Sequence, residues 1–202
     1  MANNNKGSIP TTAAVDESSG ELVPQHASKQ LVEEGYDQIA PRYLEWTTSR
    51  SSPRPRYLHK LLELLPNRSQ IIDLGCGSGV PCTQLLAQQH EVTGIDISSA
   101  QIELARRHVP NAQFLKGDMM TLEFGEGKFG AVVAFYSVIH LPREEQEVML
   151  KRIGRWLCDG GYLLVNLGAR DDPGSINENV RKISPFALQD FSRYVPSFTL
   201  VD

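Results

Sequence analysis

Apolar positions along the chain follow two periodicities. From residue 28 to about residue 50 they recur at helical spacing and predict an amphipathic helix, and a second helix is predicted over residues 56–65. From residue 70 onward, short runs that are apolar throughout alternate with amphipathic segments. The apolar runs predict strands over residues 70–74, 91–95, 112–115, 129–135 and 162–167. The segments between them predict helices over residues 80–89, 98–108 and 142–157, with Ser98 as an N-cap, and Asp159-Gly160-Gly161 predicts a turn.

Strands without polar alternation are buried on both faces, as in a parallel sheet covered by helices. Because strands and helices alternate, the predicted fold class is α/β, with one doubly wound, mostly parallel sheet of Rossmann-like type and N-terminal helices that cap it. Residues 1–27 are rich in small and polar residues and predict a disordered tail. Residues 28–202 predict a single domain, since 202 residues are too few for two of ordinary size.

Composition narrows the class of partner. The formal net charge of −4 argues against a protein that coats nucleic acid or binds an anionic membrane. No apolar run reaches the length of a membrane span, and the first 27 residues show neither a secretory nor a mitochondrial leader, so we expect a cytoplasmic protein. Three cysteines suit a reducing compartment, and no Cys/His cluster has zinc spacing, so no metal is predicted.

Residues 71–79 are the most informative segment, because a glycine cluster joins a strand to a helix there. The dinucleotide fingerprint requires a glycine at position 80, which is Val80 here. Asp73 would repel a pyrophosphate but could anchor an ammonium group, directly or through water. Asp96 ends the next strand, 21 positions after Gly75, where an acid would hold a ribose diol. A ligand with a ribose and an ammonium group but no phosphate, such as S-adenosylmethionine, fits both acids.

From residue 36 to residue 167 the chain resembles the class I S-adenosylmethionine-dependent methyltransferases of small-molecule type. The matching motifs, in order, are residues 36–43 (an N-terminal lid segment), 73–79, 94–98, 117–119, 129–142 and 156–164. The resemblance implies that S-adenosyl-L-methionine is the cofactor and that it contacts residues on each of these segments. The implied contacts are Gly75, Cys76, Gly77 and Gly79 on the turn; Asp96 and Ile97 at the ribose; Gly117, Asp118 and Met119 at the adenine; Tyr136 and Ser137; and Tyr36 and Tyr43 near the methionine carboxylate or the substrate.

Each implied contact has a structural alternative. The glycines could form a ligand-free turn, Asp96 could stabilise a helix N-terminus, and Asp118 and Met119 could be a solvated acid and a packing residue. Tyr36 and Tyr43, which share a helix face, could be core residues.

His140 is the candidate catalytic residue, because an imidazole near the end of the fourth strand could take a proton from an acceptor hydroxyl or amine. A structural histidine at the start of the next helix is the alternative. Methyl transfer depends mainly on proximity and orientation, so a base is needed only when the acceptor must lose a proton early.

Only 35 residues follow residue 167, whereas the family sheet usually adds a helix and an antiparallel hairpin. Residues 184–194 could be that helix and residues 197–201 one strand of the hairpin, which predicts an incomplete hairpin and a sheet edge left uncovered. A homodimer could cover that edge, or the chain could be a shortened variant with weak or no turnover.

The predicted function is transfer of a methyl group to oxygen, nitrogen or carbon of a small-molecule substrate. The first alternative is a protein of the same fold that binds the cofactor without methyl transfer, as a cyclase, a partner subunit or an inactive shortened variant. A nicotinamide oxidoreductase is disfavoured by Val80. A protein- or RNA-directed enzyme is disfavoured because residues 136–139 lack the Asn/Asp-Pro-Pro-aromatic run of many such methyltransferases.

Overall fold

The apolar runs assemble into one sheet of six strands in which every neighbouring pair is parallel. The computed structural model describes residues 14–15, 22–23, 25–166 and 197–201. The sheet order is β5-β4-β3-β6-β7-β8, and β3, the first of these six strands along the chain, lies near the centre of the sheet. The strands are β3 (Gln70–Leu74), β4 (Glu91–Asp96), β5 (Gln113–Lys116), β6 (Phe129–Ala134), β7 (Leu157–Asn166) and β8 (Ser197–Val201). This arrangement confirms the predicted α/β fold class.

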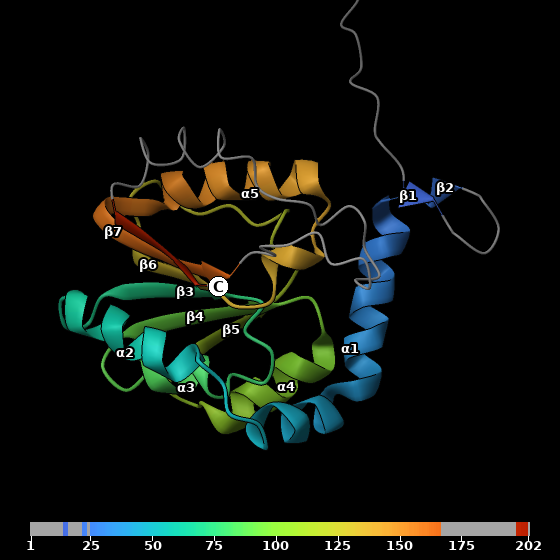
Figure 1. Ribbon diagram of the computed structural model, residues 1–202, viewed down its shortest axis with the longest axis horizontal. Coiled ribbons are helices and arrows are strands. Elements are labelled where there is room, and N and C mark those ends of the chain that lie inside the picture. The colour runs from blue at the N-terminus through green and yellow to red at the C-terminus, as the bar shows by residue number, and fades with distance from the viewer. Residues whose placement is uncertain (1–13, 16–21, 24, 167–196, 202) are drawn as a thin grey trace, which may run out of the picture.

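Helices cover both faces of the sheet, as the apolar strands require. They are α1 (Gln25–Thr48), α2 (Arg54–Leu64), α3 (Cys82–Leu86), α4 (Ser99–His108) and α5 (Arg143–Trp156), with a 3-10 turn, η1, over Val138–His140. In Figure 1, α5 lies above the sheet, α2, α3 and α4 lie below it, and α1 stands at the side. None of the described helices combines the length and the apolar character that crossing a membrane requires.

Alternate residues of the central strands belong to two hydrophobic cores, one on each face of the sheet. Ile71 of β3 packs with the helices of one face, whereas its neighbour Ile72 packs with α5 on the other face. The α5 side is centred on Trp156, which is 1% exposed. The strands thus pack against α2, α3 and α4 on one face and against α5 on the other.

The largest differences from the prediction lie near the N-terminus and in β7. The helix α1 begins at Gln25, before the expected residue 28, and β1 (Ala14–Val15) pairs antiparallel with β2 (Leu22–Val23) inside the segment expected to be disordered. The remaining residues of that segment lie outside the described part of the chain. The predicted turn at residues 159–161 is a bulge within β7, because Leu157 pairs with Phe129 and Tyr162 already pairs with Ala131.

The C-terminal strand β8 is present at the predicted residues, but it runs parallel to β7 and not as half of an antiparallel hairpin. Parallel neighbours need a crossover of a dozen or more residues, and the segment between Asn166 and Ser197 is long enough to provide one. The predicted helix over residues 184–194 falls outside the described residues.

Candidate functional site

The carboxyl ends of the central strands open onto one pocket, which α1 covers from the side. From β3 the chain continues to β4 and β5 on one side of the sheet, whereas from β6 it continues to β7 and β8 on the other side. The carboxyl-edge pocket lies between β3 and β6, where the strand order reverses, and open parallel sheets bind ligands at this point. Its lining includes these predicted site residues: Tyr36, Tyr43, Gly75, Cys76, Gly77, Asp96, Ile97, Gly117, Asp118, Met119, Tyr136, Ser137 and His140. Asp73 and Gly79 were predicted to contact the ligand but are not part of the lining.

The glycine turn after β3 is held against β4 and β6. The backbone N–H groups of Gly75 and Cys76 both donate to the carbonyl of Ile95, at 2.7 and 2.9 Å. Gly75 has a φ of 70°, and a Cβ built on it would lie 2.2 Å from the Cβ of Ser137. Glycine is therefore required at this position both for the conformation and for the close approach of Ser137, which follows β6.

Gly79 and Cys76 have packing roles. A Cβ on Gly79 would lie 3.1 Å from Val109 and 3.5 Å from Ala105, so this glycine lets α4 pack against the turn. That contact explains why Gly79 does not face the pocket. Burial raises the pKa of the Cys76 thiol, which stays protonated, so Cys76 offers the pocket no nucleophile.

Asp96 ends β4 with its carboxylate at the pocket. One oxygen accepts the N–H of Gly77 at 2.9 Å and the other accepts the N–H of Ser98 at 2.9 Å. Burial raises the pKa of Asp96, and these two hydrogen bonds act in the opposite direction. The carboxylate is oriented by the turn on one side and by the N-terminus of α4 on the other, and it offers acceptors to a ligand with hydroxyl donors.

Asp73 lies behind the turn and is only 2% exposed. Its Oδ2 accepts a hydrogen bond of 2.6 Å from the Thr83 hydroxyl on α3. Burial raises the pKa of Asp73 to about 6, while the Thr83 hydrogen bond and the charge of Arg54 lower it and the charge of Asp96 raises it. Asp73 thus lies outside the lining of the carboxyl-edge pocket, and its hydrogen bond with Thr83 ties the end of β3 to α3. Its contact with a ligand ammonium group, directly or through water, stays a prediction.

The buried Asp73 should make stability depend on pH. Between its ordinary pKa of 3.8 and about 6, the folded protein keeps a proton on Asp73 that the unfolded chain has lost. The stabilisation is complete below pH 4 and is lost as pH rises toward 6, a change of about 3 kcal/mol. The variant Asp73→Asn keeps an acceptor for Thr83 and lacks this loss. In urea unfolding from pH 4 to 7, the free energy of unfolding of Asp73→Asn should increase relative to that of the unaltered protein. A difference that stays constant with pH would contradict the raised pKa of Asp73.

Arg54, at the start of α2, lies in the lining although no sequence motif marked it. Its guanidinium carbon is 5.6 Å from the centre of the Tyr136 ring, and its Nε donates to the Ser52 hydroxyl at 3.0 Å. Among the described residues, no carboxylate forms an ion pair with Arg54. This cation is thus available to an anionic group of a ligand.

Tyr136 has an unusual backbone for a large residue, with a φ of 55°. Its N–H donates to the Oδ1 of Asn166, at the end of β7, in a short hydrogen bond. A non-glycine residue in the left-handed region persists only where its surroundings hold it. The hydrogen bond with Asn166 stabilises this backbone conformation, and the Tyr136 ring lies beside Arg54 at the pocket.

The α1 wall of the pocket is aromatic. Tyr36 lies edge-on to Tyr43, with ring centres 5.3 Å apart, and its hydroxyl is 3.1 Å from the Nε2 of His140. Burial raises the pKa of Tyr36 and lowers the pKa of His140, so both side chains are neutral at pH 7. A neutral imidazole in this position can accept a proton.

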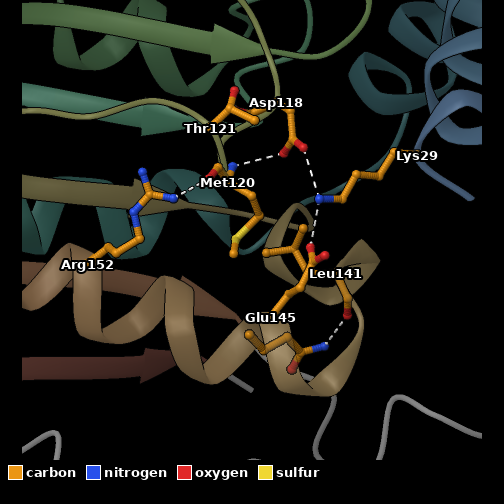
Figure 2. Close-up of polar contacts among 8 residues, drawn as sticks. Lys29, Asp118, Met120, Thr121, Leu141, Glu145 and Arg152 are labelled. Carbon is orange, nitrogen blue, oxygen red and sulfur yellow. Dashed lines mark hydrogen bonds and ion pairs between the residues drawn. The ribbon is translucent and has the colours of Figure 1, made fainter. Parts of the chain in front are cut away.

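Lys29 of α1 joins the loop after β5 to α5, as Figure 2 shows. Its Nζ lies 2.9 Å from the Oδ2 of Asp118 and 2.8 Å from the Oε2 of Glu145. Burial lowers the pKa of Lys29, but the hydrogen bonds and charges of the two acids outweigh it and raise the pKa above its ordinary value. Arg152 holds the same loop from the other side by donating to the carbonyls of Met120 and Leu122.

Two further polar side chains of the lining have no hydrogen-bond partner among the described residues. They are Gln101, at both ends of its amide, and Ser137, at its hydroxyl. Buried polar atoms in native proteins are nearly always paired, so these unpaired atoms stand out among the residues of the lining. Gln101 escaped notice in the sequence because its spacing within α4 is that of a core position. In the described part of the chain, no group of three or more His, Cys, Asp or Glu could hold a metal.

Comparison with known proteins points to one family. Residues 71–161 match the family described as a methyltransferase domain. Trans-aconitate 2-methyltransferase of Delftia acidovorans is 30% identical over 128 residues, which cover 62% of this chain and 47% of that protein. The 2-methyl-6-phytyl-1,4-hydroquinone methyltransferase of Synechocystis is 34% identical over 117 residues, 55% of this chain and 36% of that protein. The chain thus spans half or less of the length of the curated relatives it matches.

Solved structures share the fold. A TehB-like S-adenosylmethionine-dependent methyltransferase from Corynebacterium glutamicum superposes with a TM-score of 0.60 and 22% identity, covering 82% of this chain and 83% of that one. The [4+2]-cyclase SpnF superposes with a TM-score of 0.63 and 22% identity, covering 82% of this chain and 71% of that one. At this identity the likeness concerns the fold.

Proposed function

Since this chain carries a domain of the class I S-adenosylmethionine-dependent methyltransferase family, we propose that it binds S-adenosylmethionine and transfers a methyl group to a small-molecule acceptor. The observation that supports this most directly is the carboxyl-edge pocket, whose lining brings together the glycine turn, Asp96 and Ser137. A location in the cytoplasm, the absence of a nucleic-acid partner and a homodimer stay predictions from the sequence.

The pocket residues fit the chemical groups of this cofactor. Asp96 accepts from the ribose hydroxyls, and the loop of Gly117, Asp118 and Met119 borders the adenine. Arg54 pairs with the methionine carboxylate, since it lies at the turn end of the pocket near Asp73. When bound, the cofactor supplies a methyl carbon made electrophilic by a sulfonium.

The residues of α1 and η1 shape the acceptor side. Tyr36, Tyr43 and Tyr136 provide aromatic surface, which positions an acceptor by burying it beside the cofactor. His140 accepts a proton from an acceptor hydroxyl or amine, because its lowered pKa keeps the imidazole neutral at pH 7. Tyr36 orients the imidazole through its hydroxyl.

The variant His140→Gln should lower kcat by about a hundred-fold with an acceptor that loses a proton, because general-base assistance is removed. Affinity for S-adenosylhomocysteine should change little, since His140 lies on the acceptor side. Tyr36→Phe, which removes only the orienting hydroxyl, should have a smaller effect on kcat. Steady-state kinetics with a methyl-labelled cofactor measure both; an unchanged kcat in His140→Gln would assign His140 a structural role.

A protein described as a [4+2]-cyclase has the same fold. The alternative function is therefore that this chain binds the cofactor without transferring its methyl group. Methyl-labelled S-adenosylmethionine, incubated with the protein and a mixture of small metabolites, separates the two. Label in a product and release of S-adenosylhomocysteine would support methyl transfer. Tight binding of both cofactor forms without label transfer to any acceptor would favour the alternative.

A further inference from the structure

Lys29 of α1 is paired with two acids that come from different parts of the chain. Its Nζ lies 2.9 Å from Asp118, in the loop after β5, and 2.8 Å from Glu145, in the first turn of α5. Figure 2 shows the ammonium group between the two carboxylates. The three side chains are between 16% and 21% exposed, so water screens their charges less than those of a surface ion pair. Lys29 and Asp118 line the carboxyl-edge pocket, whereas Glu145 does not.

The helix α1 depends on polar contacts for its position over the pocket. Of its residues from 29 to 48, only Ala40 is buried. Lys29, Glu33 and Asp37 are spaced four positions apart, so they share one side of the helix. Each has a polar partner on another element, since Glu33 pairs with Lys116 at 2.6 Å and Asp37 accepts hydrogen bonds at the N-terminus of α4. Lys29 provides the contact of this series that reaches the pocket.

Asp118 holds the loop after β5 through both of its carboxylate oxygens. Its Oδ1 accepts the N–H of Met120 at 2.9 Å, and its Oδ2 is the oxygen that faces Lys29. Arg152 of α5 donates to the carbonyl groups of Met120 and Leu122, so the same loop is also attached to α5 directly. Three elements, α1, this loop and α5, thus meet at the ammonium group of Lys29 (Figure 2).

The charges of the two acids explain why a cation is needed at this junction. Asp118 and Glu145 each place an oxygen about 3 Å from one nitrogen atom, so these oxygens are less than about 6 Å apart. Two ionised carboxylates at this separation repel each other unless a positive charge lies between them. Without Lys29, the loop after β5 and the first turn of α5 would therefore be driven apart.

We propose that Lys29 is a positioning residue, whose ammonium group holds α1 and the loop after β5 against α5 and so fixes one side of the carboxyl-edge pocket. This inference rests on the proposed function, because it is measured by affinity for a form of the cofactor. It follows that Glu145, which lies outside the pocket lining, controls ligand affinity through Lys29. The alternative role of Glu145 is to stabilise the N-terminus of α5, as acids in the first turn of a helix do, without an effect on the pocket.

Calorimetric titration with S-adenosylhomocysteine tests the role of the cation, and thermal unfolding establishes that each variant is folded at the temperature of the titration. Lys29→Met should weaken binding by about ten-fold, whereas Lys29→Arg, which keeps the charge, should bind within about three-fold of the unaltered protein. Lys116→Met is the matched control, because it removes another ion pair between α1 and the end of β5 but lies outside the pocket lining. It should change affinity by less than about three-fold. A loss in Lys116→Met as large as that in Lys29→Met would overturn the proposal, since general loosening of α1 would then explain both.

Glu145→Gln tests the charge balance between the two acids. In the unaltered protein this substitution should weaken binding by about three-fold, because Lys29 loses one of its two charged partners. In the Lys29→Met background it should instead strengthen binding, because it removes the repulsion between Glu145 and Asp118. Effects of the same sign in both backgrounds, or an unchanged affinity in Glu145→Gln alone, would overturn the proposal. If the unaltered protein does not bind S-adenosylhomocysteine, the proposed function itself fails.

Discussion

Replacing Gly75 with alanine is expected to lower the free energy of unfolding by about 3 kcal/mol and to abolish binding of S-adenosylhomocysteine. The added Cβ would lie 2.2 Å from the Cβ of Ser137 and 3.4 Å from its Cα, so the segment between β6 and η1 must move away from the turn. The φ of 70° adds conformational strain for any residue with a Cβ. Urea unfolding and calorimetric titration measure the two effects.

Two other glycines serve as controls that separate the steric effect of the added Cβ from the strain of a positive φ. Gly160 has a φ of 73° with nothing within 4 Å of a built Cβ, so Gly160→Ala should show the conformational strain alone, about 1 kcal/mol. Gly125 has neither a positive φ nor a neighbour within 4 Å, so Gly125→Ala should be close to neutral. Equal losses of stability in Gly75→Ala and Gly160→Ala would mean that the segment around Ser137 moves aside without an energetic cost, which would contradict the close contact of Gly75 with Ser137.

The variant Asp96→Ala should weaken binding of S-adenosylhomocysteine by about a thousand-fold, because hydrogen bonds to a charged acceptor are among the strongest contacts in a binding site. Loss of this carboxylate also frees the N–H groups of Gly77 and Ser98, which it holds at 2.9 Å each. Asp96→Asn keeps one acceptor and the shape of the side chain, so its affinity for S-adenosylhomocysteine should lie between those of the unaltered protein and Asp96→Ala. Calorimetric titration below the melting temperature of each variant provides the comparison.

Asp37 is the matched acid for this test. Its Oδ1 accepts from the Ser98 hydroxyl and from the N–H of Ala100, so it contacts the same N-terminus of α4 as Asp96. It does not line the carboxyl-edge pocket. Asp37→Asn should therefore change affinity by less than about three-fold, given that one acceptor remains. Equal losses of affinity in the Asp37 and Asp96 variants would show that the helix terminus, and not the pocket carboxylate, governs binding.

The fold was predictable because its signals are local. The apolar run Gln70–Leu74 became β3 at the predicted residues, and Ser98 caps α4 by accepting the N–H of Gln101 at 3.1 Å. The bulge in β7 was not predictable, because the Gly-Gly signal of a turn is the same whether the chain reverses or bulges. Pairing of Leu157 and Tyr162 with β6 decides between the two, and pairing is a tertiary property.

The site residues that belong to sequence motifs were predictable, whereas those that depend on contacts between separate helices and strands were not. Asp96 and the glycine turn lie at the pocket as expected, since the end of a parallel strand is a place that sequence order specifies. The side to which Asp73 points is set by Thr83 on the following helix, a contact that spacing does not reveal. Arg54 and Gln101 were missed because each becomes a pocket residue only once its helix is packed against the sheet.

The contact between Gly75 and Ser137 joins residues 62 positions apart, and the chain completes β4, α4 and β5 between them. During synthesis on the ribosome, the segments proposed to surround the ribose and adenine emerge before β6 and the turn that follows it. The nascent chain therefore acquires one half of the pocket well before the other. A ligand that contacts both halves can stabilise the protein fully only once Gly75 and Ser137 have come together.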